Sequence, residues 1–361
     1  MILLLLGLRV AVAISVVLDA PHYPSAAADR FFQIAQAHGV PYRDYPVEYP
    51  IGDFLLFKVI GMSTADLTRV LLGVVAFGAD LVAFGAVLYG WGKQVAVRYL
   101  WLGTPLLIFI YRRSDLVAVA LAALGLAWAK RGRQVRGGLA LGVATFVKLW
   151  PALLAPALLL MRRGRAAFVF AVSLVVGFAG WIAVGGVAGI QQVTTFRGAS
   201  GWELESSVGA VVWAITGHHR FEQGANRTGS VPGWARALMV ALLVATFVAV
   251  WLRARRRADD VSGTPALAVL AALLFLSPVL SPQYVAWLLP WGAVASMESR
   301  RWFWLTLIPV GITGALVTTW YVDLNMGPGW NQIVLTARNA SLLAIPLVWF
   351  LERRPVRRPP A

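Results

Sequence analysis

The polar interval that follows the first apolar run of the chain spans residues 19–51 and reads DAPHYPSAAADRFFQIAQAHGVPYRDYPVEYPI. It collects four acidic side chains, two arginines, two histidines and four tyrosines in one segment. Most of the chain after it consists of apolar runs separated by short polar connections. Ionisable groups are costly inside hydrocarbon, so this segment predicts a loop held outside a membrane. It is the largest such collection in the chain, and we expect the chemistry of the protein to lie there.

The composition indicates a membrane-embedded chain. Of the 361 residues, 59% are hydrophobic, and the mean hydropathy of +0.71 is far above that of a soluble domain. We expect an all-α polytopic bundle of about 10–12 transmembrane helices. The apolar segments are 2–18, 66–90, 96–111, 114–129, 136–147, 150–161, 166–186, 232–252, 264–280, 284–297, 302–320 and 333–351.

The net charge of +16 has two readings. In a soluble protein it would suggest nucleic-acid binding. In a membrane protein, lysine and arginine collect in cytoplasmic loops, and here they cluster in alternate connections such as 130–136, 253–257 and 300–301. The second reading predicts a multi-pass plasma-membrane protein with both termini in the cytosol, an extracytoplasmic active site and no nucleic-acid partner.

Several kinds of chemistry are excluded or not expected. The chain has no cysteine, which excludes disulfides, thiolate catalysis and cysteine-ligated metals. Its four histidines show neither HExxH nor HxH spacing, so we expect no metal site. No cofactor is expected either.

Residues 1–351 are predicted to form a single integral membrane domain, followed by a basic cytoplasmic tail at 352–361. Residues 19–65 and 187–231 are its two large extracytoplasmic loops. Within the second loop, the spacing of apolar residues at 204–215 predicts an amphipathic helix lying on the membrane interface. The first apolar run has the length of a cleaved signal peptide. However, its only positive charge, Arg9, lies inside the run, which favours a retained helix.

Three pairs of apolar segments are short enough to form tight hairpins. Their tips are polar or contain proline and read YRRSD (111–115), VKLWP (147–151) and SPVLSPQY (277–284). Non-helical backbone at membrane depth survives only beside protein or a water-filled cavity, so these tips predict a cavity near the outer surface. Lys148 has apolar runs on both sides; such a lysine is either functional or directed to the interface by its long side chain.

These residue types suit one kind of reaction. A carboxylate near a membrane surface can act as general base on a hydroxyl group. Arginine and lysine hold phosphate through charge-assisted hydrogen bonds. Together they suit transfer of a group from a phosphate-linked lipid to a hydroxyl acceptor.

Several motifs resemble those of the family 87 glycosyltransferases. These belong to the GT-C superfamily and include actinobacterial mannosyltransferases that use polyprenyl-phosphate mannose. The motifs run in order from residue 19 to about 290. They are D-x3-Y (Asp19, Tyr23), GVPYRDYPVEYP (39–50), R-x-D (Arg113, Asp115), FVKLWP (146–151), E-S (Glu205, Ser206) and SPQY (281–284). The chain departs from the usual pattern at Ile51, where a second proline is common.

The resemblance implies an inverting, metal-independent transferase that works on the extracytoplasmic face of the lipid bilayer. Its donor would be a polyprenyl-phosphate sugar, most simply mannose, and its acceptor a glycolipid or glycan. Asp19 would be the catalytic base. The substrate-binding residues implied are Tyr23, Tyr42, Arg43, Asp44, Glu48, Tyr49, Arg112, Arg113, Asp115, Lys148, Glu205, Gln283 and Tyr284.

Other readings stay open at this point. The chain would suit a transporter or lipid-linked-sugar flippase if Lys148 and Asp80 worked inside the membrane. It would suit a non-catalytic scaffold if the site were inactive. Asp29 and Asp44 are alternative bases, and Asp44 and Glu48 could simply pair with Arg43.

Overall fold

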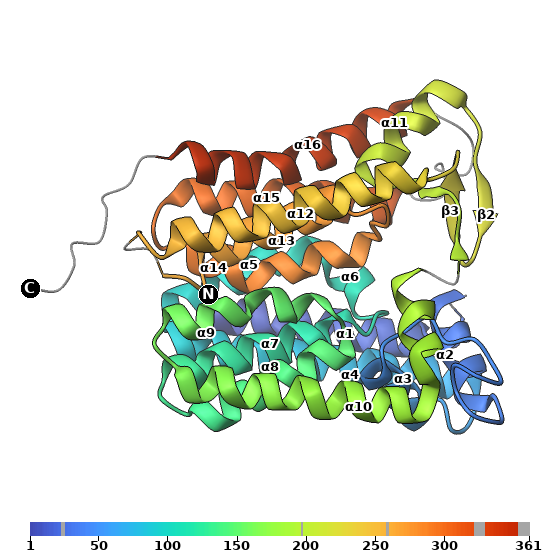
Figure 1. Cartoon of the computed structure of the whole chain (residues 1–361), viewed down its shortest axis with the longest axis horizontal. Coiled ribbons are helices and arrows are strands. Elements are labelled where there is room, and N and C mark those ends of the chain that lie inside the picture. Colours follow the sequence, from blue (N-terminus) through green and yellow to red (C-terminus); the bar gives the residue numbers. More distant parts are fainter. Residues whose placement is uncertain (23–25, 196–197, 258–259, 321–328, 353–361) are drawn as a thin grey trace, which may run out of the picture. The chain divides into compact units, whose positions relative to one another are not determined.

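The computed structural model describes residues 1–22, 26–195, 198–257, 260–320 and 329–352. Tyr23 and the tail from residue 353 onward lie outside the described residues. The chain divides into two compact units, Met1–Ala199 and Ser200–Ala361, called here the first and the second unit (Figure 1). Helices dominate both, which confirms the predicted all-α class.

The regular elements in the described part of the first unit are all helices. Its elements are α1 (Ile2–Asp19), α2 (Ala26–Gln36), α3 (Ile51–Ile60), α4 (Ala65–Trp91), α5 (Lys93–Gly103), η1 (Thr104–Leu106), α6 (Leu107–Ile110), α7 (Asp115–Lys130), α8 (Gln134–Val147), η2 (Trp150–Leu154), α9 (Ala155–Leu160) and α10 (Gly164–Thr194). In Figure 1, α2 and α3 lie at one end of this unit.

The second unit combines helices with a small sheet. Its elements are β1 (Trp202–Glu203), α11 (Ser207–Thr216), β2 (Arg220–Glu222), β3 (Ala225–Thr228), α12 (Gly233–Ala254), α13 (Thr264–Leu276), η4 (Pro282–Leu288), α14 (Leu289–Ala295), α15 (Arg300–Ala315), η5 (Leu316–Trp320) and α16 (Trp330–Leu351). The sheet has the antiparallel order β1-β3-β2, with Glu203 opposite Arg227. The strands and α11 lie at one end of this unit (Figure 1).

The predicted polytopic membrane class is confirmed by helix length and hydropathy. Among the described residues, six helices are long and apolar enough to cross a membrane: α1, α4, α10, α12, α15 with its extension to Thr318, and α16. The predicted hairpin segments are shorter, as expected; α7 has 16 residues and α8 has 14. The predicted span 96–111 is broken into α5, η1 and α6.

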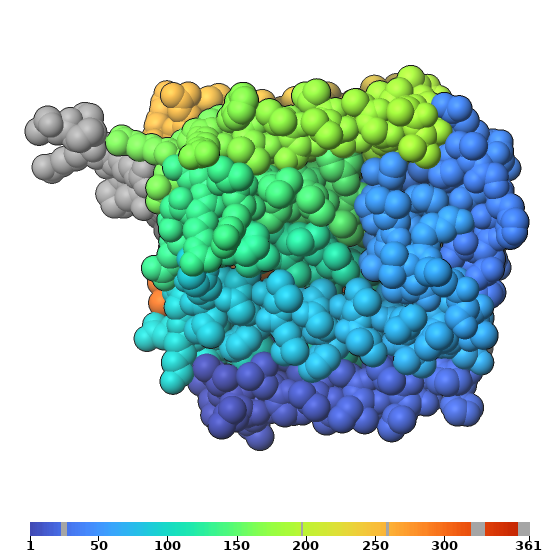
Figure 2. All heavy atoms as spheres, turned by 90° about the horizontal axis from the view of Figure 1, so that it is seen from below, coloured from blue at the N-terminus to red at the C-terminus, as the bar shows by residue number. Residues whose placement is uncertain are grey.

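A buried ion pair joins α1 to α4 inside the first unit. Arg9 Nε donates to Asp80 Oδ2 at 2.9 Å, and the two side chains are only 1% and 2% exposed. The hydroxyls of Tyr99 and Tyr111 also donate to Asp80, at 2.6 and 2.7 Å. Both oxygens of Asp80 are therefore satisfied by protein groups. Figure 2 shows α1 lying along the neighbouring α4 segment of this unit.

Replacing Arg9 by methionine is expected to lower the stability of the protein by about 3–5 kcal/mol, because the Asp80 charge would stay buried without its ion-pair partner. Methionine keeps most of the side-chain length. Unfolding in detergent measures the loss, with the exposed Arg165→Met as a matched control of little effect. The double variant Arg9→Met/Asp80→Asn is expected to regain most of the loss. A double variant as unstable as Arg9→Met would contradict the ion-pair explanation.

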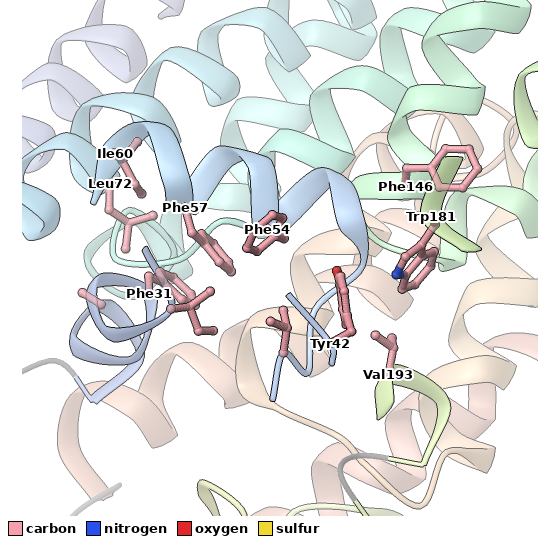
Figure 3. Packing of buried hydrophobic residues seen from close by; sticks show 12 residues of the cluster. Phe31, Tyr42, Phe54, Phe57, Ile60, Leu72, Phe146, Trp181 and Val193 are labelled. Atoms are coloured by element: carbon pink, nitrogen blue, oxygen red, sulfur yellow. The ribbon is translucent and has the colours of Figure 1, made fainter. Parts of the chain in front are cut away.

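An aromatic cluster fixes the first loop and α3 within the first unit (Figure 3). The rings of Phe31 and Phe57 stack at 3.9 Å between centroids, and Tyr42 lies against Phe54 and Trp181. Each fully buried phenylalanine contributes roughly 1.5–3 kcal/mol. The cluster therefore holds α3 rigidly beside the bundle.

Two glycines shape the helices around this loop. A Cβ at Gly52 would lie 2.6 Å from the backbone carbonyl of Phe146, so the start of α3 contacts the end of α8 directly. Gly186 has φ 66°, a conformation that favours glycine, and it kinks α10. The next residue after Gly52 is Asp53, which the close contact brings to the α8 terminus.

Candidate active site

The turn between α6 and α7 connects two charged groups of the first unit. This turn was predicted as the hairpin tip 111–115. Arg112 Nη2 donates to Asp19 Oδ2 at 2.8 Å. Two residues further along, Ser114 Oγ donates to Asp53 Oδ2 at 3.2 Å. The hydroxyl of Tyr111 anchors the start of the turn to Asp80. One short segment thus fixes the end of α1 and the start of α3.

Asp19 is the last residue of α1 and is half exposed, with 50% of its side-chain surface accessible. Arg112 is mostly buried, at 15%. The guanidinium therefore holds an accessible carboxylate in place. An accessible carboxylate is able to receive a proton from a hydroxyl group that comes within hydrogen-bonding distance.

Lys148 lies directly after the last residue of α8, where the backbone is extended. Its Nζ lies 2.6 Å from Asp53 Oδ2, and 5.0 Å from the centroid of the Tyr49 ring. Lys148 is 13% exposed and Asp53 is fully buried. The second oxygen of Asp53, Oδ1, has no hydrogen-bond partner within the described part of the chain. Lys148 is thus an ordered cation fixed by an ion pair and an aromatic face.

The electrostatics of this cluster follow from its burial. Burial raises the pKa of Asp53 above its usual value, and the Lys148 charge opposes that rise. Asp115 lies close enough to raise the same pKa. Burial also raises the pKa of the Tyr49 hydroxyl, which keeps it protonated, while Lys148 and Arg113 act in the opposite direction. The structure thus brings together the predicted Tyr49, Arg113, Asp115 and Lys148.

The remaining predicted residues of the first loop make hydrogen bonds within the loop and to the helices α2 and α10. Arg30 donates two bonds of 2.9 Å to the carboxylate of Glu48. The backbone amide of Val40 donates to Asp44 at 2.6 Å. The other two contacts are Tyr42 Oη to the Tyr49 carbonyl at 2.8 Å and Arg43 Nη2 to the Ala183 carbonyl at 3.4 Å. These residues shape the loop, and Tyr42 is buried in the aromatic cluster.

Three further predicted residues lie in the second unit. Glu205 forms a buried ion pair with Arg338, with 2.7 Å between Oε2 and Nη1. Gln283 and Tyr284 belong to η4. The ring of Tyr284 stacks on Trp287 at 4.3 Å between centroids. Tyr23, the last predicted residue, lies outside the described residues.

Sequence reasoning missed three polar residues of these clusters: Asp53, Ser114 and Glu203. A signal existed for Asp53, since it is an acid at the start of the apolar run IGDFLLF. Ser114 and Glu203 had no comparable signal. Their positions depend on contacts between residues 61 and 78 positions apart. In the described chain, no group of three or more histidine or acidic side chains is placed to hold a metal ion.

Glu203 is buried in the second unit, and burial together with the neighbouring Glu205 raises its pKa from 4.5 to about 7. The folded protein therefore binds the proton more tightly than the unfolded chain. Stability is expected to fall as pH rises from about 4.5 to about 7, by at most about 3 kcal/mol. Thermal unfolding in detergent across this range measures the slope. Glu203→Gln, which cannot ionise, should flatten it; an unchanged slope would assign the pH dependence to other groups.

A multi-pass helical protein with an accessible carboxylate and fixed cations has the equipment for group transfer at a membrane. A scan against known protein families matches glycosyltransferase family 87 over residues 48–282, more than half of the chain. The chain belongs to this family. It is therefore a membrane glycosyltransferase. A comparison with the curated proteins finds no match. The matched range includes Asp53, Arg112 and Lys148 and begins after Asp19.

Proposed function

We propose that the protein transfers a hexose, mannose, from a polyprenyl-phosphate donor to a lipid-linked or cell-envelope glycan acceptor. The transfer takes place on the extracytoplasmic face of the plasma membrane and inverts the configuration at the anomeric carbon. The observation that carries the proposal is the turn at 111–114, which contacts two carboxylates. Arg112 in this turn binds the accessible Asp19. Ser114 binds the buried Asp53, which is the ion-pair partner of Lys148. The family and the GT-C-like resemblance support the donor class.

In the proposed reaction the acceptor oxygen attacks the anomeric carbon of the donor sugar. A new C–O bond forms as the bond between that carbon and the phosphate oxygen breaks. Polyprenyl phosphate leaves with the bonding electrons, and Asp19 takes the proton of the acceptor hydroxyl. The acceptor oxygen and the leaving group lie on opposite sides of the anomeric carbon, which produces inversion.

The cations act on the leaving group. A sugar phosphodiester carries one negative charge, and the departing phosphate monoester carries more. Cations near the phosphate therefore stabilise the transition state more than the bound donor. We assign this role to Lys148, with Arg112 and Arg113 on the adjacent turn. Asp53 and Tyr49 hold the ammonium group of Lys148 in place.

The basic connections between spans support the proposed orientation. Under the positive-inside rule they favour an orientation with both termini in the cytosol and the first loop outside it. Asp80, a candidate for intramembrane transport chemistry, is bonded by Arg9 and two tyrosines. Such a satisfied group suits a structural role better than a transport cycle.

The test is sugar transfer by purified protein in nanodiscs. Radiolabelled polyprenyl-phosphate mannose is supplied with a membrane-lipid extract and EDTA, and products are separated by chromatography. We expect label in a new glycolipid or glycan. Failure with mannose, followed by failure with glucose and arabinose donors, would overturn the proposed donor class. Movement of the donor across the bilayer without a new glycosidic bond would establish transport instead.

A further inference from the structure

Glu203, at the end of β1, has a role that the proposed chemistry does not assign. Its side chain is nearly buried, with 6% of the residue exposed. Ser281 Oγ donates to Oε1 at 3.3 Å. The other oxygen, Oε2, is buried without a hydrogen-bond partner in the described part of the chain. Native proteins rarely leave such a group unsatisfied, because burying it costs the hydrogen bonds it made to water.

The backbone around Glu203 is fixed by several contacts of the second unit. Its amide donates to the Pro278 carbonyl at 3.1 Å, and it pairs with Arg227 across the sheet. A Cβ at Gly209 would lie 2.0 Å from the Glu203 carbonyl oxygen, so α11 packs directly on this strand. The carboxylate is therefore held in place and cannot swing out to solvent without disturbing the sheet.

The surrounding charges nearly balance. The neighbouring carboxylate of Glu205 is paired with Arg338. Arg227 faces Glu203 and donates to the carbonyls of Gly201 and Glu222 at 3.1 and 3.2 Å. Two acidic and two basic side chains thus compensate one another. The group that satisfies Oε2 should be a neutral hydrogen-bonding group rather than a cation.

A hydroxyl group fits this requirement. It donates to a carboxylate and accepts from a carboxylic acid, so it bonds Glu203 in either protonation state. The Ser281 hydroxyl is a second polar group beside the Glu203 carboxylate. Along the chain it is followed by Gln283 and by Tyr284, whose ring stacks on Trp287.

We propose that Glu203 and Ser281 form a subsite for the hydroxyl groups of a neutral hexopyranose. The inference rests on the proposed function only in that the sugar belongs to a substrate of transfer. Both the donor sugar and the acceptor sugar have this chemistry. The kinetic experiment below distinguishes them, and the binding experiment does not require transfer at all.

Binding is tested with methyl α-D-mannopyranoside and the corresponding glucoside and galactoside. Saturation-transfer NMR with protein in nanodiscs reports contact and gives the Kd. At least one glycoside is expected to bind wild type, and Glu203→Ala should weaken it about 10- to 100-fold, the effect of losing a hydrogen bond to a charged group. Ser281→Ala should weaken it less. Binding of none of the three by wild type, or equal binding by Glu203→Ala, would overturn the subsite.

Two control variants separate folding and catalysis from binding. Glu222→Gln changes a carboxylate of the same sheet that already accepts bonds from Ser200 and Gly201, and it should bind like wild type. Asp19→Asn should also bind like wild type, even if it transfers no sugar. Glu203→Gln keeps the size of the side chain. The near-UV circular dichroism of both Glu203→Gln and Glu203→Ala should match wild type, which excludes a loss of folding as the cause of weaker binding.

The source of the sugar follows from steady-state kinetics of the Glu203 variants. A raised KM for the glycan acceptor with an unchanged KM for the donor assigns the subsite to the acceptor. The reverse assigns it to the donor sugar. A loss of kcat with both KM values and glycoside binding unchanged would contradict the subsite. If wild type transfers no sugar yet binds a glycoside, the proposed function fails while the subsite stands.

Discussion

Replacing Asp19 by asparagine is expected to lower kcat of sugar transfer by about 10²–10⁴-fold, the range for loss of a general base. The amide keeps the shape of the side chain and its contact with Arg112 but cannot take up the acceptor proton. The KM for the donor should change little, because Asp19 is not assigned to the phosphate. Single-turnover transfer in nanodiscs measures the chemical step directly.

The matched control is Asp66→Asn, an exposed acid of the same unit that pairs with Arg69 away from the turn. It should transfer sugar like wild type. Equal transfer by Asp19→Asn would retain the enzyme and reject this base. Asp29 and Asp44 would then be replaced next, although the structure gives both a partner: Arg69 at 2.6 Å and the Val40 amide at 2.6 Å.

Replacing Lys148 by methionine is expected to have two separable effects. The KM for the donor should rise about 10- to 100-fold, as expected for loss of a charge-assisted bond to phosphate. Stability should fall by about 3–5 kcal/mol, because Asp53 would stay buried without its cation. Losing the Lys148 charge also raises the pKa of Asp53 further. The instability should therefore grow as pH rises and the Asp53 carboxyl is forced to ionise.

The double variant Asp53→Asn/Lys148→Met distinguishes the two effects. It removes both charges, so thermal stability should return close to that of wild type. The KM for the donor should stay high, since the cation is still missing. Recovery of donor affinity in the double variant would show that Lys148 acts only as the counter-ion of Asp53, and would remove it from the phosphate site.

The sequence predicted the membrane class and most of the long helices, because spanning length and hydropathy are properties of continuous segments. The hairpin tips at 111–115 and 147–151 were also predicted, and both occupy the turns that carry the candidate site. The helix expected at 204–215 is present as α11, Ser207–Thr216. The family suggested by the motifs is confirmed. The catalytic and binding assignments remain predictions.

What the sequence did not predict depends on contacts between distant segments. The strands β1 to β3 have only two to four residues, and their pairing is stabilised by partners elsewhere in the chain. Asp53 lies beside the end of α8 because Gly52 allows α3 to contact α8, which comes about ninety residues later in the chain. Lys148 was recognised from its apolar surroundings, but its partner was not. The sequence of one segment shows a charge that is costly to bury, but it does not show which distant residue pairs with that charge.

The pair between Arg9 and Asp80 has a consequence for how the protein is made. Seventy-one residues separate the two partners, so α1 is synthesised well before the carboxylate it needs. An arginine near the middle of an inserting helix costs about 2.5–3.5 kcal/mol, which the leucine-rich start of α1 offsets. Arg9 can form its ion pair with Asp80 only after α4 has been synthesised. The depth and rotation of α1 are fixed only at that later step, and with them the position of Asp19 at its end. An unrelated apolar helix grafted in place of α1 would enter the bilayer, but nothing would set its register.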